Sequence, residues 1–237
     1  MNENEFLANY DSQAFPSPLV TVDSVLFTYV DDALRVLLVK RDERPDKGYW
    51  GLPGGFVLMD ADEDLEAAAY RKLQEKTGVN PPYLEQLYSV GNAARDKRGW
   101  SVTVCYTALM AHQDCAAHVE SVADVQWFEV EDAVATQLAF DHGTLMECAL
   151  ERLRHKALYS IVPAYALGDT FTLPELQQLH ERLIGKPLQK RSFRRRIEQA
   201  DLLIDTGEKR SEGGRPAALY RMKESAREHT FLRNLES

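Results

Sequence analysis

The chain has 237 residues, 44% of them hydrophobic and 27% charged, with a formal net charge of −9. These proportions are typical of a soluble globular protein, and no apolar run approaches the ~20 residues that a membrane-spanning helix needs. The polar, acidic start MNENEFLANYD is unlike a signal peptide, and the spacing of Cys105, Cys115 and Cys148 indicates neither disulfides nor a metal site. We therefore expect a cytoplasmic protein with reduced thiols.

Charge is divided unevenly along the chain. Residues 156–237 carry 15 basic and 11 acidic side chains, whereas the first 155 residues carry 13 basic and 26 acidic ones. An acidic N-terminal part joined to a basic C-terminal part favours two domains, of which the second meets a polyanion. Uneven surface charge without a function is the alternative at this point.

The N-terminal part predicts several strands around one helix. The segments LVTVDSVLFTYV and ALRVLLVK, separated by a DD turn, are rich in β-branched residues and predict two strands over 19–40. The segment RDERPDKGYWGLPGG predicts a loop because of its prolines and glycines. A helix led by acidic residues is expected over 62–78, and further strands over 84–96, 99–111 and 122–130.

The C-terminal part predicts helices followed by a hairpin. A helix over 142–160 leads to a domain boundary near YSIVPAYAL, where the charge balance changes sign. Helices are then expected over 173–185 and 189–203, with Pro174 in the first turn of the former. The last segment, 202–223, predicts a strand, a glycine-rich loop and a second strand.

The stretch from Gly54 to Val79 has the chemistry of a diphosphate site. Its glycines allow close backbone approach, and the start of the helix offers free amides. A hydrolase would also need Mg²⁺, held by carboxylates spaced three and four residues apart on one helical face. The corresponding triplet here is Lys72, Glu75 and Lys76. We therefore predict weak metal binding, little or no hydrolysis, and lysines that hold a diphosphate directly.

A ligand site is predicted from the residues near this loop that offer stacking, backbone approach or charge: Arg41, Trp50, Gly54, Gly55, Phe56, Arg71, Lys72, Glu75 and Lys76. Trp50 can stack on a ring or pack in a core. Arg71 can reach a phosphate or pair with Glu75, four residues further on. The hairpin segment with Arg95, Lys97 and Arg98 is better explained as solvated. No catalytic or metal-binding residue is predicted.

The second C-terminal helix and the loop after it predict a DNA-binding surface. Two helices with a short joint, followed by a hairpin with a basic tip, describe a winged helix-turn-helix. The second helix would enter the major groove, and the wing would contact the backbone or the minor groove. The predicted contacts are Lys190, Arg191, Ser192, Arg194, Arg195, Arg196, Lys209, Arg210 and Arg215.

Residues 55–79 resemble the Nudix box, G-x5-E-x7-R-E-U-x-E-E-x-G-U, where U is aliphatic. Lys72 and Lys76 stand where that family places metal-binding glutamates, and the gap from Gly55 to Glu63 is two residues longer than the pattern. The resemblance implies an N-terminal domain with an α/β/α sandwich fold. The matching residues are Gly55, Glu63, Arg71, Leu73, Glu75, Gly78 and Val79.

A degenerate Nudix domain followed by a winged helix resembles the NrtR family, the Nudix-related transcriptional regulators of NAD metabolism. The resemblance implies a Nudix-like domain over 1–158 and a DNA-binding domain over 159–237. It also implies a homodimeric repressor of genes for NAD synthesis or salvage that binds a palindromic operator, needs no cofactor, and leaves DNA when it binds ADP-ribose or a related nucleotide.

Two alternatives stay open on the sequence. The first is an active ADP-ribose pyrophosphatase with a DNA-binding appendage, in which Asp60, Asp62 or Asp64 replaces a lost metal ligand. The second is a DNA-binding protein whose Nudix domain is a scaffold that senses no nucleotide.

Overall fold

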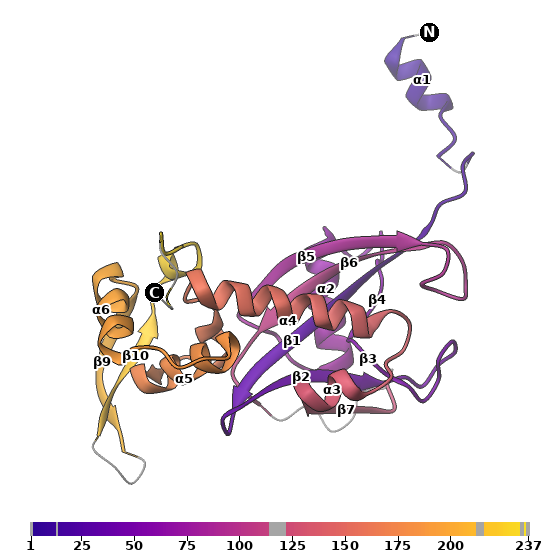
Figure 1. The fold of residues 1–237 in the computed structure, drawn as a ribbon. Coiled ribbons are helices and arrows are strands. Elements are labelled where there is room, and N and C mark those ends of the chain that lie inside the picture. The colour runs from indigo at the N-terminus through magenta and orange to yellow at the C-terminus, as the bar shows by residue number, and fades with distance from the viewer. Residues whose placement is uncertain (1, 13, 114–121, 212–215, 233–234, 236–237) are drawn as a thin grey trace.

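The computed structural model describes the chain except for residues 1, 13, 114–121, 212–215, 233–234 and 236–237. A sheet-based N-terminal domain is followed by a smaller C-terminal domain, and a short arm carrying α1 (Glu3–Asn9) projects from the first domain (Figure 1). The sequence did not predict α1. Among the described residues, every helix is too short or too polar to span a bilayer.

In the described part of the N-terminal domain, seven strands form one mixed sheet. β1 pairs in parallel with β6 and antiparallel with β2 and β4. β5 extends the sheet beyond β6, while β3 and β7 both pair with β2. The strands are β1 (Leu19–Val30), β2 (Ala33–Lys40), β3 (Trp50–Gly51), β4 (Gly54–Phe56), β5 (Tyr83–Asn92), β6 (Ser101–Leu109) and β7 (Asp124–Glu129).

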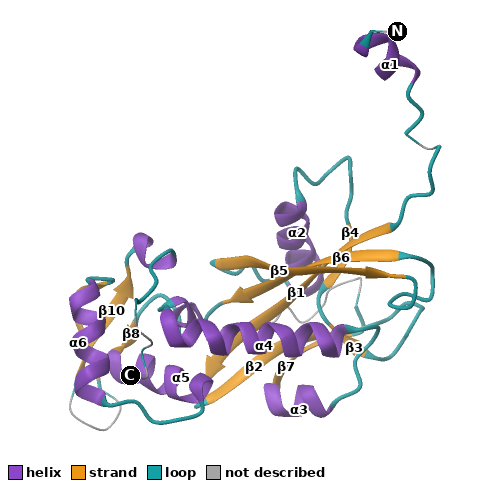
Figure 2. Cartoon of the chain, turned by 45° about the horizontal axis from the view of Figure 1, so that its top comes forward, coloured by secondary structure: helices purple, strands orange, loops and turns teal. Residues whose placement is uncertain are grey.

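Helices cover both faces of this sheet, which gives the predicted α/β/α sandwich (Figure 2). α2 lies on one face and α3 and α4 on the other. α2 begins where the Asp64 side chain accepts a hydrogen bond from the Ala67 amide, and it ends at Gly78, whose φ of 73° suits a residue without a Cβ. These helices are α2 (Leu65–Thr77), α3 (Val130–Ala135) and α4 (His142–Tyr159).

The C-terminal domain has a core of its own, built around the buried side chains of Phe171, Phe193 and Ile197. Two helices and a three-stranded sheet of order β8-β10-β9 surround it, as a winged helix requires. The elements are η1 (Val162–Ala166), β8 (Phe171–Thr172), α5 (Leu173–Ile184), α6 (Lys190–Ala200), β9 (Leu203–Arg210), β10 (Ala217–Met222) and η2 (Glu224–Arg227).

Local backbone geometry shortens two of the predicted elements. The helix predicted over 189–203 ends at Ala200, because Asp201 adopts a left-handed conformation with φ of 53°. The strand predicted over 84–96 ends at Asn92, whose side chain accepts two backbone hydrogen bonds and turns the chain toward Arg95. The predicted domain boundary between 158 and 159 falls in the last turn of α4, and it stays a prediction.

A buried histidine at the junction of α4 and α5 makes the stability of the fold depend on pH. His180 is fully buried, and its Nδ1 lies 2.9 Å from the Ala157 carbonyl oxygen. Burial lowers the pKa of His180 to about 4, from an ordinary value of 6.5. The unfolded chain therefore binds a proton more readily, and the folded chain loses up to ~3 kcal/mol of stability as pH falls from 6.5 toward 4.

We expect His180→Leu to remove this loss of stability, because leucine does not titrate. Urea unfolding of the wild type and of the variant at pH 7 and pH 5 measures the difference between their pH dependences. His155→Leu is the control, because His155 is exposed on α4. Parallel pH curves for wild type and His180→Leu would contradict the assignment.

Candidate functional site

A narrow cleft lies in the N-terminal domain where β1, β4 and the start of α4 meet. Gly54 of β4 pairs with Asp23 of β1, and the two strands approach closely. Glycine is needed here because a Cβ at position 54 would collide with the Asp23 side chain. Gly55 has a φ of 153°, and the Lys72 side chain lies over it. The cleft is lined by Thr21, Asp23, Arg41, Leu52, Gly54, Gly55, Arg95, Asp96, Arg98, Phe140 and His142.

A network of buried charges forms the floor of the cleft. The Arg95 guanidinium donates to both carboxylate oxygens of Asp141, at 3.0 and 2.9 Å, and its Nη2 lies 3.7 Å from the Asp23 carboxylate. Asp23 also accepts a 2.7 Å hydrogen bond from Thr103. Burial lowers the pKa of His142, so its ring is neutral at pH 7, with Nε2 3.6 Å from Asp23. The floor therefore holds the Arg95 guanidinium, a group that can bind phosphate, between the carboxylates of Asp23 and Asp141.

Two arginines and two aromatic rings form the rim of the cleft. The Arg41 guanidinium lies 4.6 Å from the centre of the Phe140 ring. The Arg98 guanidinium lies 4.8 Å from the Phe56 ring and 5.9 Å from the Phe140 ring. Burial, followed by the charge of Arg98, lowers the pKa of Arg41, which nevertheless stays charged in water. The rim is therefore positive and suits an anion.

The face of α2 next to the cleft carries paired charges. Arg71 donates to both carboxylate oxygens of Asp62, at 2.5 and 2.6 Å, and to Glu75 at 2.9 Å. Lys72 holds the other oxygen of Glu75 at 2.8 Å. Burial and the charge of Lys72 lower the pKa of Lys76. Of the two roles predicted for Arg71, the i,i+4 pair with Glu75 is the one seen.

These residues do not fit a divalent metal ion. Both oxygens of Glu75 already accept a hydrogen bond from a cation, and Arg71 neutralises Asp62. Asp64 caps α2. Among the described residues, no three His, Cys, Asp or Glu side chains gather in the way that a metal site requires. Lys72 and Lys76 add positive charge where a metal would need negative charge.

Two aromatic residues of the predicted ligand site, Trp50 and Phe56, have partners within the protein. Trp50 does not line the cleft: its ring packs edge-on against Phe128, 4.9 Å away, beside the core of the N-terminal domain. Phe56 lies under the Arg98 guanidinium, so its ring face is already used. The contacts of Trp50 and Phe56 with a ligand stay predictions.

Sequence reasoning missed several residues of the cleft. The prediction that the hairpin segment is solvated is wrong for Arg95, which is 9% exposed. No motif marked Asp23, Phe140 or His142, because they come from β1 and from the start of α4. Asp23 did carry a signal, since it is the single charged residue of the predicted strand.

The second candidate site is the outer face of α6. Phe193 and Ile197 are buried, while Arg191 and Arg195, four residues apart, are exposed on the same face with Lys190 nearby. Ser192 donates its amide to the Gln189 side chain, which caps the helix. Arg194 and Arg196 are half-buried. The helix therefore presents a basic, solvent-facing surface, as a helix that enters a major groove requires.

The wing beside α6 contributes less charge than the sequence predicted. Lys209 is exposed on β9. Arg210 is held by Glu175 at 2.6 Å and by the Thr170 carbonyl oxygen at 3.2 Å, so it fastens the wing to α5. Arg215 lies outside the described residues. Contacts of these three residues with DNA stay predictions.

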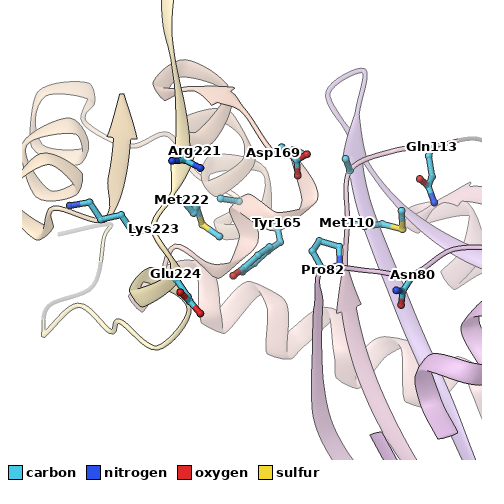
Figure 3. A pocket seen from close by; sticks show the side chains of 13 residues that line it. Asn80, Pro82, Met110, Gln113, Tyr165, Asp169, Arg221, Met222, Lys223 and Glu224 are labelled. Atoms are coloured by element: carbon cyan, nitrogen blue, oxygen red, sulfur yellow. The ribbon is translucent and has the colours of Figure 1, made fainter. Parts of the chain in front are cut away.

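A second hollow lies between the two domains (Figure 3). It has a volume of about 690 Å³. Tyr165 from η1 projects into it between Met222 of the C-terminal domain and Pro82 of the N-terminal domain. The mixture of charged and apolar side chains around it does not indicate a particular ligand.

Comparison with known proteins identifies both domains. The family model for the NUDIX domain matches residues 20–147, and that for the NrtR DNA-binding winged helix domain matches residues 163–222. The ADPR responsive transcriptional repressor NtrR of Acinetobacter baylyi is 43% identical over 99% of this chain and 94% of its own.

Solved structures agree with these matches. NrtR of Shewanella oneidensis in complex with a 27mer DNA is 61% identical, with a TM-score of 0.86 over 92% of this chain and 99% of its own. The NUDIX domain of the same protein with ADP ribose is 58% identical, with a TM-score of 0.62 over 65% of this chain and 99% of its own. The Nudix sandwich, the winged helix and the similarity of the whole chain lead to one conclusion: this protein belongs to the NrtR family.

Proposed function

We propose that this protein is a transcriptional repressor that binds operator DNA through α6 and leaves it when its Nudix domain binds ADP-ribose. The exposed basic face of α6 supports the first part. The related repressor is described as ADPR responsive, and the related NUDIX domain was solved with ADP ribose, which supports the second. The targets are genes for NAD synthesis or salvage, and the protein acts in the cytoplasm as a homodimer on a palindromic operator.

The Nudix domain binds ADP-ribose without hydrolysing it. The observation that carries this proposal is the pairing of Glu75 with Arg71 and Lys72, which removes a carboxylate that hydrolysis would need for Mg²⁺. Arg41, Lys72 and Lys76 supply positive charge beside the glycines instead. A diphosphate can therefore bind to side chains directly, and no cofactor is required.

The test follows ADP-ribose and DNA in the same sample. ³¹P NMR of ADP-ribose with the protein and Mg²⁺ over several hours is expected to show broadened diphosphate signals and no phosphomonoester. Fluorescence anisotropy of a palindromic duplex, selected from random DNA by the protein, is expected to fall as ADP-ribose is added. Signals of AMP and ribose phosphate would instead show an active pyrophosphatase, and constant anisotropy would show that the nucleotide does not control DNA binding.

A further inference from the structure

α4 begins at the floor of the Nudix cleft. Asp141 is its N-cap residue, and His142, its first residue, lines the cleft. The Asp141 side chain makes no capping hydrogen bond to the helix. Its two carboxylate oxygens accept from Arg95 instead. The start of α4 is therefore held in place by a side chain of the cleft.

The other end of α4 is part of the C-terminal domain. The carbonyl oxygens of its last turn accept backbone hydrogen bonds of 2.7 Å from Phe231 and Leu235. The Ala157 carbonyl oxygen meets the ring of His180 from α5 at 2.9 Å. With 18 residues, α4 spans about 27 Å at the usual rise of an α-helix. One rigid element thus joins the cleft to the DNA-binding domain.

The innermost part of the cleft, beside Asp23 and Gly54, is too small for a whole nucleotide in this conformation. Its volume is about 50 Å³. Pockets that hold small-molecule ligands usually measure roughly 300–1,000 Å³. The stacked Arg41, Phe140 and Arg98 side chains close its rim, and Arg95 is buried at its floor with two carboxylates. A phosphate group that reaches this innermost part must therefore move its walls, and the start of α4 is one of them.

We propose that Arg95 couples ligand binding to DNA release by exchanging Asp141 for the diphosphate of the ligand. A guanidinium forms paired hydrogen bonds with a phosphate as readily as with a carboxylate. An anion beside Arg95 also repels Asp141. The exchange therefore frees the start of α4, which moves and carries the C-terminal domain with it. This proposal rests on the proposed function, because it assumes that a diphosphate nucleotide binds in the Nudix cleft.

The junction between the domains leaves room for such a movement. The hollow in Figure 3 lies between β10 and η1 on one side and Pro82 and Met110 on the other. At its edge Gly168 lies close to the Ala111 side chain, since a Cβ added to Gly168 would be 3.3 Å from the Cβ of Ala111. Elsewhere the junction is packed, because Leu179 and Leu183 of α5 are buried in the same apolar cluster as Phe27 of the N-terminal sheet. A movement of α4 is therefore passed to the C-terminal domain through this shared core.

Asp141→Asn tests the proposal, because it weakens the hold of Arg95 on α4 and leaves Arg95 itself in place. Binding and release are linked, so the two affinities must change in opposite directions. We expect ADP-ribose to bind about 3–10-fold more tightly and ligand-free protein to bind its selected duplex about 3–10-fold more weakly. Calorimetry with ADP-ribose and anisotropy with the duplex measure these constants. A purely structural role for Asp141 would weaken both.

Glu147→Gln is the matched control, since Glu147 is exposed on the same helix and the charge change is identical. Both affinities unchanged in Asp141→Asn, or a weaker affinity for ADP-ribose, would overturn the proposal. If the variant does not fold, hydrogen exchange on the wild type decides. ADP-ribose must then speed exchange of the Leu145 amide, which donates to the Asp141 carbonyl oxygen at the start of α4, and an unchanged rate overturns the coupling.

These outcomes separate the coupling from the proposed function. If ADP-ribose does not release DNA from the wild type, the proposed function fails, and the coupling fails with it. If ADP-ribose releases DNA equally from the wild type and from Asp141→Asn, with unchanged affinities, the coupling fails alone. Arg95→Gln removes both the contact with the diphosphate and the hold on Asp141, so the coupling predicts loss of ADP-ribose binding together with weaker DNA binding by the ligand-free protein. Full DNA binding in this variant would contradict the coupling.

Discussion

Replacing Arg191 and Arg195 with alanine is expected to weaken operator binding by about 10³-fold. Each arginine contact with DNA contributes on the order of 1–3 kcal/mol, and a two-fold symmetric dimer loses each contact twice. Both side chains are exposed on the face of α6 opposite the buried Phe193 and Ile197, so the fold should be unaffected. Anisotropy of the selected duplex at several salt concentrations measures the loss.

The salt dependence tells which part of DNA these arginines meet. Contacts with phosphates would reduce the slope of log K against log salt by about 0.9 for each phosphate, whereas contacts with bases would relax sequence preference. The matched control is Arg152→Ala with Arg154→Ala, two exposed arginines on α4. Equal affinities in the two double variants would show that α6 is not the recognition helix.

The second large effect is expected from replacing Lys72 and Lys76 with glutamate. The change puts carboxylates back at positions where the Nudix box has them, and it reverses two charges beside the diphosphate. On the Coulomb scale in water this costs about 3 kcal/mol or more for a doubly charged anion, at separations of roughly 8 Å. We therefore expect ADP-ribose affinity in EDTA to fall at least 10²-fold, measured by calorimetry, and to recover in part with Mg²⁺ or Mn²⁺.

Charge reversal at a distant position is the control for this experiment. Arg152→Glu with Arg154→Glu makes the same change in net charge on the exposed side of α4. If nucleotide affinity without metal is unchanged in Lys72→Glu with Lys76→Glu, the lysines do not hold the diphosphate. In that case the rim arginines, Arg41 and Arg98, and the floor arginine, Arg95, carry the positive charge that the ligand needs.

The fold class followed from local patterns that tertiary contacts did not override. β-Branched runs gave the strands of the sheet, and the acid-led helix ended at Gly78 as expected, since a left-handed residue there is cheapest without a Cβ. The apolar pair Phe193 and Ile197 likewise placed the buried face of α6. The predicted ends of β5 and α6 were wrong. The Asn92 side chain turns the backbone after β5, and the positive φ of Asp201 ends α6. Neither feature changes the periodicity of hydrophobic residues in the sequence.

The sequence by itself determined the family, the loss of metal-binding carboxylates at Lys72 and Lys76, and the basic helix, because each of these depends on residue type at fixed local spacing. Only the tertiary structure decided which charged and aromatic side chains have partners within the protein. Arg210 is fastened to Glu175, Trp50 packs on Phe128, and Arg95, expected to be solvated, is buried with Asp141. These pairs join residues far apart in the chain, and such contacts depend on how the strands and helices pack, which local spacing does not specify.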